Sequence, residues 1–122
     1  MSASKENNAA YTDPMLIKNS SYKCGKKSDI FSLGVIFWEI FSGKSPCEGH
    51  TQSAEIFKYR LKGFRDKPVP GIPDEYTKLY TDCWNEDPDK RPFCKEIHDR
   101  LKLFEQLAMQ GDQSSVEQGN NP

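Results

Sequence analysis

The stretch YKCGKKSDIFSLGVIFWEIFSGKSP (Tyr22–Pro46) decides how the rest of the sequence is interpreted. Its middle is apolar almost without a break, whereas the whole chain has a mean hydropathy of -0.80. Val35–Trp38 point in four successive directions around a helix axis, so no face is free of apolar groups. We expect a helix over residues 29–42 that is buried on nearly every side. Ser28 is a candidate N-cap, and Gly43 stands where a helix-ending glycine belongs.

The rest of the chain shows helical patterns separated by proline and glycine, and no convincing strand. We expect a short helical turn near Pro14 and helices over about residues 52–62, 74–84 and 92–109. The last helix has an apolar stripe at helical spacing, made of Phe93, Ile97, Leu101 and Phe104. The sequence therefore predicts an all-α fold in which the other helices surround the central one.

Composition and charge narrow the classes of function. The 122 residues suffice for one small domain, and a formal net charge of -1 gives no general attraction to nucleic acid or anionic lipid. Polar residues interrupt the longest apolar stretch, and residues 1–10 lack the apolar segment of a signal peptide. We therefore expect a cytoplasmic protein with no nucleic-acid or membrane partner. Residues 1–10 and 109–122 are rich in small polar residues, and we expect both to be disordered.

Cysteines and basic residues give no sign of a metal or polyanion site. The four cysteines form no C-x-x-C pair, and the two histidines lack ligand spacing, so we interpret the thiols as free and expect no metal. On the helix over residues 52–62 we expect the side chains of Lys58, Arg60 and Lys62 to be exposed to solvent.

Four blocks, in this order and spacing, resemble the end of a protein kinase domain. Tyr11–Met15 resembles the Ala-Pro-Glu segment that closes the activation loop, and Lys27–Ile40 is similar to the central helix of the large lobe. Ser42–Pro46 resembles the turn after that helix. Cys83–Pro92 resembles the Cys-Trp, Asp-Pro and Arg-Pro block before the last helix. The sequences Trp38–Ile40 and Cys83–Trp84 are most similar to those of the tyrosine-kinase and tyrosine-kinase-like branch.

This resemblance implies a fold and a domain boundary. Residues 11–108 would be a partial kinase domain, the helical lower half of the large lobe after the activation loop. In that fold the central helix is packed on all sides, and the catalytic loop rests on its start. A helix in that role needs no polar face, which accounts for the apolar stretch.

The resemblance also assigns structural positions. Asp29 matches the aspartate that accepts hydrogen bonds from the catalytic-loop backbone, although a carboxylate at a helix start is favourable in its own right. Trp38 and Trp84 are expected in the core.

Arg91 matches the arginine that pairs with the glutamate of Ala-Pro-Glu. This sequence has Met15 at the glutamate position, so the usual ion pair cannot form. Either Arg91 is solvated, or another carboxylate takes over, with three candidates: Asp13, Asp87 and Glu39.

The motifs that perform phosphoryl transfer are absent from these 122 residues. A complete domain would bind ATP and Mg²⁺ and transfer the γ-phosphate to a Ser, Thr or Tyr hydroxyl of a protein. The chain has no Gly-rich loop, no Val-Ala-Ile-Lys, no His-Arg-Asp and no Asp-Phe-Gly. We therefore expect a truncated, non-catalytic chain with no catalytic, cofactor-binding or metal-binding residue and no cofactor of its own.

Two alternatives remain at this point. The chain is a stand-alone helical module that binds a protein partner, or the missing kinase half, on the catalytic-loop side of the central helix. Otherwise it is a fragment too small to fold stably by itself. Its oligomeric state is left open.

Overall fold

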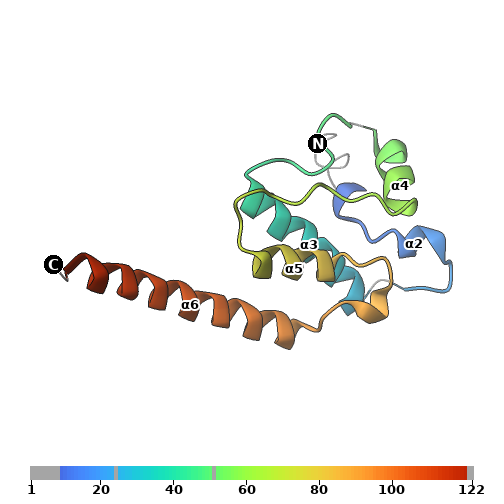
Figure 1. The fold of residues 1–122 in the computed structure, drawn as a ribbon. Coiled ribbons are helices and arrows are strands. Elements are labelled where there is room, and N and C mark those ends of the chain that lie inside the picture. Colours follow the sequence, from blue (N-terminus) through green and yellow to red (C-terminus); the bar gives the residue numbers. More distant parts are fainter. Residues whose placement is uncertain (1–8, 24, 51, 121–122) are drawn as a thin grey trace, which may run out of the picture.

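The computed structural model describes residues 9–23, 25–50 and 52–120, with side chains through Met109. A single helical turn at residues 9–11 comes first. The elements that follow are α2 (Met15–Lys18), α3 (Lys26–Ser42), α4 (Ser53–Leu61), α5 (Asp74–Cys83), the short 3-10 helix η1 (Pro88–Lys90) and α6 (Cys94–Asn120) (Figure 1). The described residues contain no strand, so the prediction of an all-α fold is confirmed.

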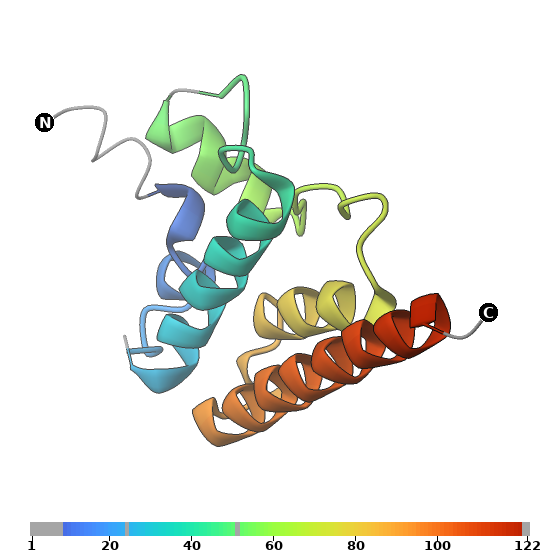
Figure 2. The same cartoon turned by 90° about the vertical axis from the view of Figure 1, so that its left-hand side faces the viewer.

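Helix α5 lies between α3 and α6 and joins them through one apolar cluster (Figure 1). The buried members of this cluster are Ile30, Leu79, Cys83, Ile97 and Phe104. Figure 2 shows α5 running alongside α6, with α3 and the N-terminal segments on the other side of α5. Helix α3 therefore packs directly against α5, and α6 packs against the same helix.

The closest approach of α3 and α5 depends on a glycine. A Cβ at Gly34 would lie 2.7 Å from the Cβ of Cys83 and 3.0 Å from the backbone oxygen of Tyr80. Both distances are too short for any side chain. The absence of a side chain at Gly34 therefore sets how near the two helices pack.

Two tryptophans build a second cluster between α3 and the end of α5. Trp38 is 6% and Trp84 is 4% exposed, and Phe31, Val35 and Tyr80 complete the buried cluster. The indole Nε1 of Trp38 donates to the carbonyl oxygen of Lys67 at 2.7 Å. Burial of the ring and satisfaction of its one donor hold the irregular segment after α4 against α3.

Helix α3 begins earlier than the sequence predicts. Gly25, and not Ser28, occupies the N-cap position, and the Asp29 amide donates to the Gly25 carbonyl at 3.1 Å. Ser28 is buried, and its hydroxyl donates to the Tyr22 hydroxyl at 3.4 Å instead of capping the helix. At the other end Gly43 has the expected left-handed conformation, with φ of 68°.

One stripe of α3 is exposed, which corrects the expectation of burial on nearly every side. Ile36 is 40% and Ile40 is 67% exposed, and Asp29 lies on the same stripe at helical spacing. Helix α5 and the N-terminal segments contact the other faces of α3. No described element covers this stripe.

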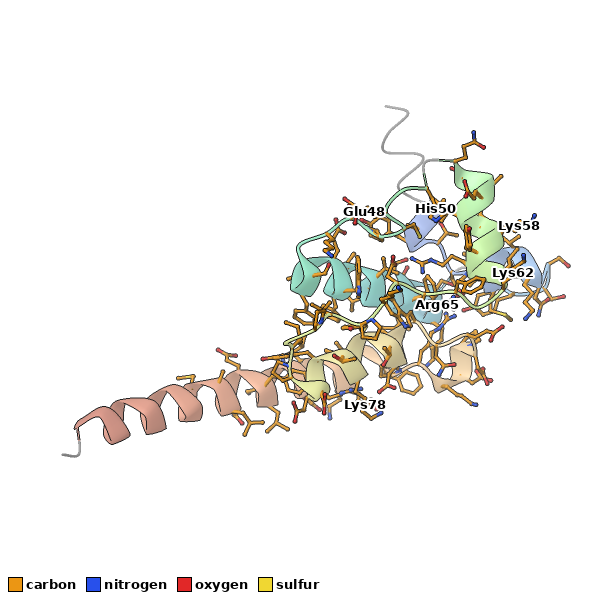
Figure 3. The ribbon with its side chains drawn as sticks, turned by 45° about the horizontal axis from the view of Figure 1, so that its top comes forward. Glu48, His50, Lys58, Lys62, Arg65 and Lys78 are labelled. Atoms are coloured by element: carbon orange, nitrogen blue, oxygen red, sulfur yellow. The ribbon has the colours of Figure 1, made fainter. Side chains whose placement is uncertain are left out.

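Helix α4 carries one basic residue into the interior. Lys58 and Lys62 are exposed, as expected (Figure 3). Arg60, expected on the same exposed face, is only 2% exposed. Its Nη2 donates to the carbonyl oxygen of Ala10 at 3.1 Å and to Oδ2 of Asp66 at 3.1 Å. Arg60 therefore ties α4 to the N-terminal turn and to the segment that follows α4.

The two ends of the chain differ from the expected disorder. Helix α6 continues past Met109 to Asn120, whereas the sequence predicts a disordered tail over residues 109–122. At the other end Ala9 and Ala10 are buried against Ile56. Residues 1–8 and 121–122 lie outside the described residues.

The start of α6 also differs from the predicted apolar stripe. Ile97 and Phe104 are buried, but Phe93 is 67% exposed because it lies just before the first residue of α6. The ammonium of Lys27 sits 3.7 Å from the centre of the Phe93 ring. Phe93 thus contacts the start of α3 and not the core.

No helix in the described part of the chain is both long and apolar enough to cross a membrane.

Candidate functional site at the start of helix α3

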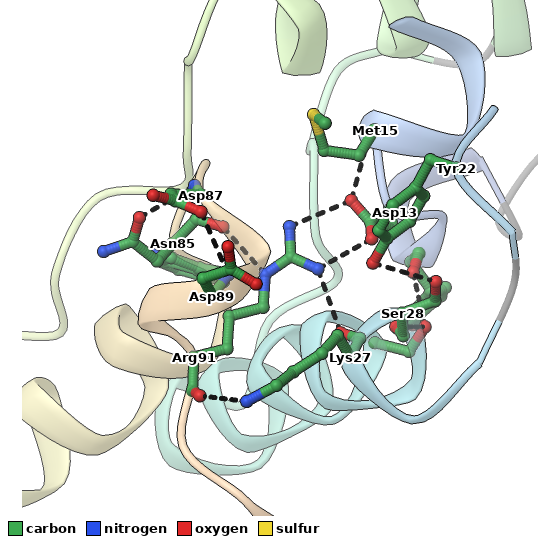
Figure 4. A network of polar contacts seen from close by, with 12 residues as sticks. Asp13, Met15, Tyr22, Lys27, Ser28, Asn85, Asp87, Asp89 and Arg91 are labelled. Atoms are coloured by element: carbon green, nitrogen blue, oxygen red, sulfur yellow. Dashed lines mark hydrogen bonds and ion pairs between the residues drawn. The ribbon is translucent and has the colours of Figure 1, made fainter. Parts of the chain in front are cut away.

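The carboxylate of Asp13 and the guanidinium of Arg91 form a buried two-point ion pair (Figure 4). Nη1 of Arg91 donates to Oδ2 of Asp13 at 2.6 Å, and Nη2 donates to Oδ1 at 2.9 Å. Asp13 precedes α2, Arg91 follows η1, and both side chains are closed to solvent. Parallel contacts of this kind are the strongest arrangement available to an arginine and a carboxylate.

The remaining donors of Arg91 bind backbone carbonyls. Nη1 also donates to Lys27 O at 2.9 Å, and Nε donates to Asn85 O at 2.8 Å. In return the Lys27 ammonium donates to the carbonyl oxygen of Arg91 at 2.6 Å. One buried arginine therefore joins three parts of the chain: the N-terminal segment, the first turn of α3 and the turn before η1.

Further donors surround the carboxylate of Asp13. The Met15 amide donates to Oδ1 at 3.0 Å, and the Tyr22 hydroxyl also bonds to the carboxylate (Figure 4). Burial acts to raise the pKa of Asp13, but hydrogen bonds from Arg91 and the Met15 amide outweigh it and bring the pKa below its ordinary value. Asp13 is thus held as the anion, and its role is structural.

The structure selects one of the three carboxylates that the sequence offered to Arg91. Asp13 binds it, whereas Asp87 accepts the Asp89 amide at 3.0 Å and Glu39 accepts the Tyr11 hydroxyl at 2.6 Å. The anion therefore stands two positions before Met15. Met15 itself contributes its backbone amide to the same network and no charge.

A polar hollow of about 340 Å³ opens beside this network. It is lined by Tyr11, Thr12, Asp13, Leu16, Ser28, Asp29 and Ser32. Its wall is fixed in part by the Ser32 hydroxyl, which donates to the Tyr11 carbonyl at 2.6 Å. None of these described lining residues is basic. The hollow presents hydroxyl and carboxylate oxygens, which suit the binding of hydrogen-bond donors better than the binding of phosphate.

Asp29 is the free acceptor at this site. Its side chain is exposed, and within the described residues it forms no hydrogen bond or ion pair. It stands in the first turn of α3, where the helix dipole favours a negative charge. Its position leaves the carboxylate available to backbone amides of another chain segment.

Sequence reasoning missed several parts of this arrangement. Tyr22 and the carbonyls of Lys27 and Asn85 carry no motif, because backbone oxygens look alike in any sequence. The sequence carries one signal: Arg91 is present while the glutamate expected at position 15 is absent, which indicated that another carboxylate pairs with Arg91.

Comparison with known proteins identifies the family. The family model described as "Protein tyrosine and serine/threonine kinase" matches residues 1–101 of this chain. The human proto-oncogene tyrosine-protein kinase ROS (Homo sapiens) is 33% identical over 96 residues, covering 78% of this chain and 4% of that protein. The dual specificity protein kinase pyk3 of Dictyostelium discoideum is 33% identical over 117 residues, covering 92% of this chain and 9% of that protein.

A third relative, the probable serine/threonine-protein kinase roco5 of Dictyostelium discoideum, is 34% identical over 112 residues, which cover 84% of this chain and 4% of that protein. The chain therefore belongs to the protein kinase family and corresponds to a C-terminal part of a kinase domain. It spans less than a tenth of the length of these three relatives.

Proposed function

We propose that this chain is the supporting, C-terminal part of a kinase domain and transfers no phosphate by itself. In the complete domain, the γ-phosphate of ATP passes to a Ser, Thr or Tyr hydroxyl of a protein. The proposal is supported by the family match over residues 1–101 and by the lack, in these 122 residues, of the segments that hold ATP and Mg²⁺.

The unpartnered carboxylate of Asp29 is the observation that carries this proposal. It stands beside the polar hollow at the start of α3, and the exposed side chains of Ile36 and Ile40 continue along the same stripe. A polar acceptor followed by apolar surface is what a docking segment of another half-domain needs. By resemblance to the family, the catalytic loop rests at this place.

A stand-alone protein-binding module is the second candidate. The buried pair of Asp13 and Arg91 favours it, because this pair and the cluster around Trp38 bring distant segments together without any further part of a kinase. Thermal unfolding of the purified chain separates a module from an unstable fragment. A module unfolds in one cooperative transition, whereas a fragment binds hydrophobic dyes and loses structure gradually.

A phosphotransfer assay tests the main proposal. The purified chain is incubated with γ-labelled ATP, Mg²⁺ and a general protein substrate, and binding of ATP is measured separately by calorimetry. We expect no transfer above a blank without the chain, and no heat of ATP binding that depends on Mg²⁺. Transfer that scales with the concentration of the chain, and that survives removal of contaminating kinases, would overturn the proposal.

A further inference from the structure

A second pocket lies between α4 and the segments on either side of it. Its volume is about 180 Å³. The residues that line it are Cys47, His50, Tyr59, Arg60, Phe64, Arg65 and Asp66. Figure 3 shows His50 before α4, Lys58 and Lys62 on α4, and Arg65 after it. Basic groups therefore lie on several sides of this pocket, unlike the hollow at the start of α3. Two acidic residues lie near His50: Glu48 (Figure 3), and Glu55, whose Oε1 is 2.8 Å from Nδ1 of His50.

The one carboxylate among the lining residues, Asp66, accepts a hydrogen bond at each of its oxygens. Oδ2 of Asp66 accepts a hydrogen bond from Nη2 of Arg60 at 3.1 Å, and Oδ1 accepts the Cys47 amide at 2.8 Å. The charges of Arg60 and Asp66 therefore offset each other, and Asp66 forms no ion pair with any other described cation.

Arg65 is the cation that remains without a counter-ion. Within the described residues its guanidinium forms no ion pair, and its hydrogen bonds go to carbonyl oxygens of Trp84, Arg60 and Phe64 at 3.0 to 3.3 Å. Burial, together with the charges of Arg60 and Arg91, lowers the pKa of Arg65 to about 10. The charges of Glu86 and Asp13 act in the opposite direction on this pKa. Arg65 therefore keeps its proton at neutral pH, and its positive charge in the wall has no direct ion-pair partner among the described residues.

Arg60 also has a donor group that no acceptor among the described residues satisfies. Its Nε is buried without a hydrogen-bond partner, in a side chain that is only 2% exposed. Buried donors in folded proteins are nearly always paired. The protein therefore supplies more positive charge and more donors around this pocket than its own acceptors satisfy.

The rim adds groups that suit a phosphate carried on an organic stem. The rings of Tyr59 and Phe64 meet edge to face with their centroids 5.6 Å apart, and the centroids of the His50 and Tyr59 rings are 4.6 Å apart. These three rings form an aromatic wall. Lys58 and Lys62 are exposed on the same helix and raise the local positive potential.

We propose that this pocket binds a phosphate group, with Arg65 as its principal anion-binding residue. A guanidinium matches phosphate oxygens in geometry and charge, and a bound phosphate supplies the anion that Arg65 lacks. The same chemistry occurs in free inorganic phosphate and in a phosphorylated side chain of a protein.

Nuclear magnetic resonance titration of the full chain tests the proposal. Inorganic phosphate, phosphotyrosine and tyrosine are added in turn at constant ionic strength, with chloride as the reference salt. We expect saturable shifts of the backbone amides of Cys47, His50 and Arg65 with both phosphates and none with tyrosine. Tighter binding of phosphotyrosine than of inorganic phosphate indicates a protein-borne ligand, and equal binding indicates the free ion. Shifts that never saturate, or that follow the exposed lysines over the whole surface, overturn the proposal.

Two substitutions sharpen the test. Arg65→Gln removes the charge and is expected to weaken phosphate binding about tenfold or more. Lys58→Gln, on α4 but outside the lining of the pocket, removes an equal charge from an exposed side chain and is expected to change affinity by less than about twofold. Equal losses in the two variants would show general attraction and contradict the assignment of Arg65. Should Arg65→Gln fail to fold, the location of the saturable shifts in the unsubstituted chain decides the question.

Discussion

Arg91 binds Asp13 through two parallel contacts of 2.6 and 2.9 Å. By resemblance to the kinase family, the glutamate partner of this arginine would be expected at position 15, where this chain has Met15. The carboxylate that pairs with Arg91 stands two positions before Met15 in the sequence, and both side chains of the pair are closed to solvent. The segment before α2 is therefore anchored to the turn at η1 by a different residue that performs the same task.

Removal of this anion should be costly. Asp13→Ala leaves the Arg91 guanidinium buried without its counter-charge, and we expect the free energy of unfolding to fall by about 3–5 kcal/mol. Urea denaturation followed by circular dichroism measures the loss. Asp87→Ala is the matched control, because its exposed carboxylate accepts only the Asp89 amide, and it should cost about 1 kcal/mol. Equal costs for the two variants would contradict the special role of Asp13.

Acid should weaken the fold through the same residue. The pKa of Asp13 lies below its ordinary value in the folded chain, so its contribution to stability is complete above the unfolded pKa of about 3.9 and is lost as the pH falls through the folded pKa. Unfolding free energies measured between pH 6 and pH 2 are expected to decline below about pH 4. Asp13→Asn should be less stable at pH 6 and show a shallower decline. An identical slope in both proteins would contradict this account.

The family arrangement should rescue the loss. In Asp13→Ala/Met15→Glu a carboxylate returns at the family position, close to Arg91 because the Met15 amide already belongs to the network. We expect this double variant to recover about half or more of the stability lost in Asp13→Ala. Asp13→Ala/Met15→Gln adds a similar side chain without the charge and should recover much less. Equal recovery in the two double variants would show that packing, and not charge, restores the fold.

The contact of α3 with α5 predicts a further sensitivity. In Gly34→Ala the new methyl group would lie 2.7 Å from Cβ of Cys83, so the two helices must move apart. We expect a loss of about 1–3 kcal/mol in unfolding free energy. Gly25→Ala is the control for steric effects, because its Cβ meets no heavy atom nearer than 3.9 Å, and the alanine at this N-cap should cost no more than about 1 kcal/mol. A neutral Gly34→Ala would mean that α3 and α5 are less closely packed than described.

Much of the fold was predictable from local pattern. The apolar run that includes Trp38 indicated a central helix, and Gly43 marked its end, because periodicity and helix-ending glycines act within a few residues. The start was misplaced since Ser28 has a capping side chain but turns it toward Tyr22. The exposure of Ile36 and Ile40 could not be predicted from this run, because burial depends on which other segments cover the helix.

The candidate site was only partly predictable, for a related reason. The sequence indicated that Arg91 lacked its glutamate and offered Asp13 among three carboxylates. The choice depends on how segments 78 residues apart come together, which no local pattern encodes. The pocket beside Arg65 was not predicted at all, since Arg60 was expected in solvent and is buried.

A double-mutant cycle on Asp13 and Arg91 is the most direct test of the central claim, that Asp13 has replaced the family glutamate. Unfolding free energies are measured for the unsubstituted chain, Asp13→Ala, Arg91→Ala and the double variant. The account predicts a coupling energy of about 2 kcal/mol or more, because each single variant strands a buried charge that the double variant removes. Additive losses, with a coupling energy below about 0.5 kcal/mol, would contradict it.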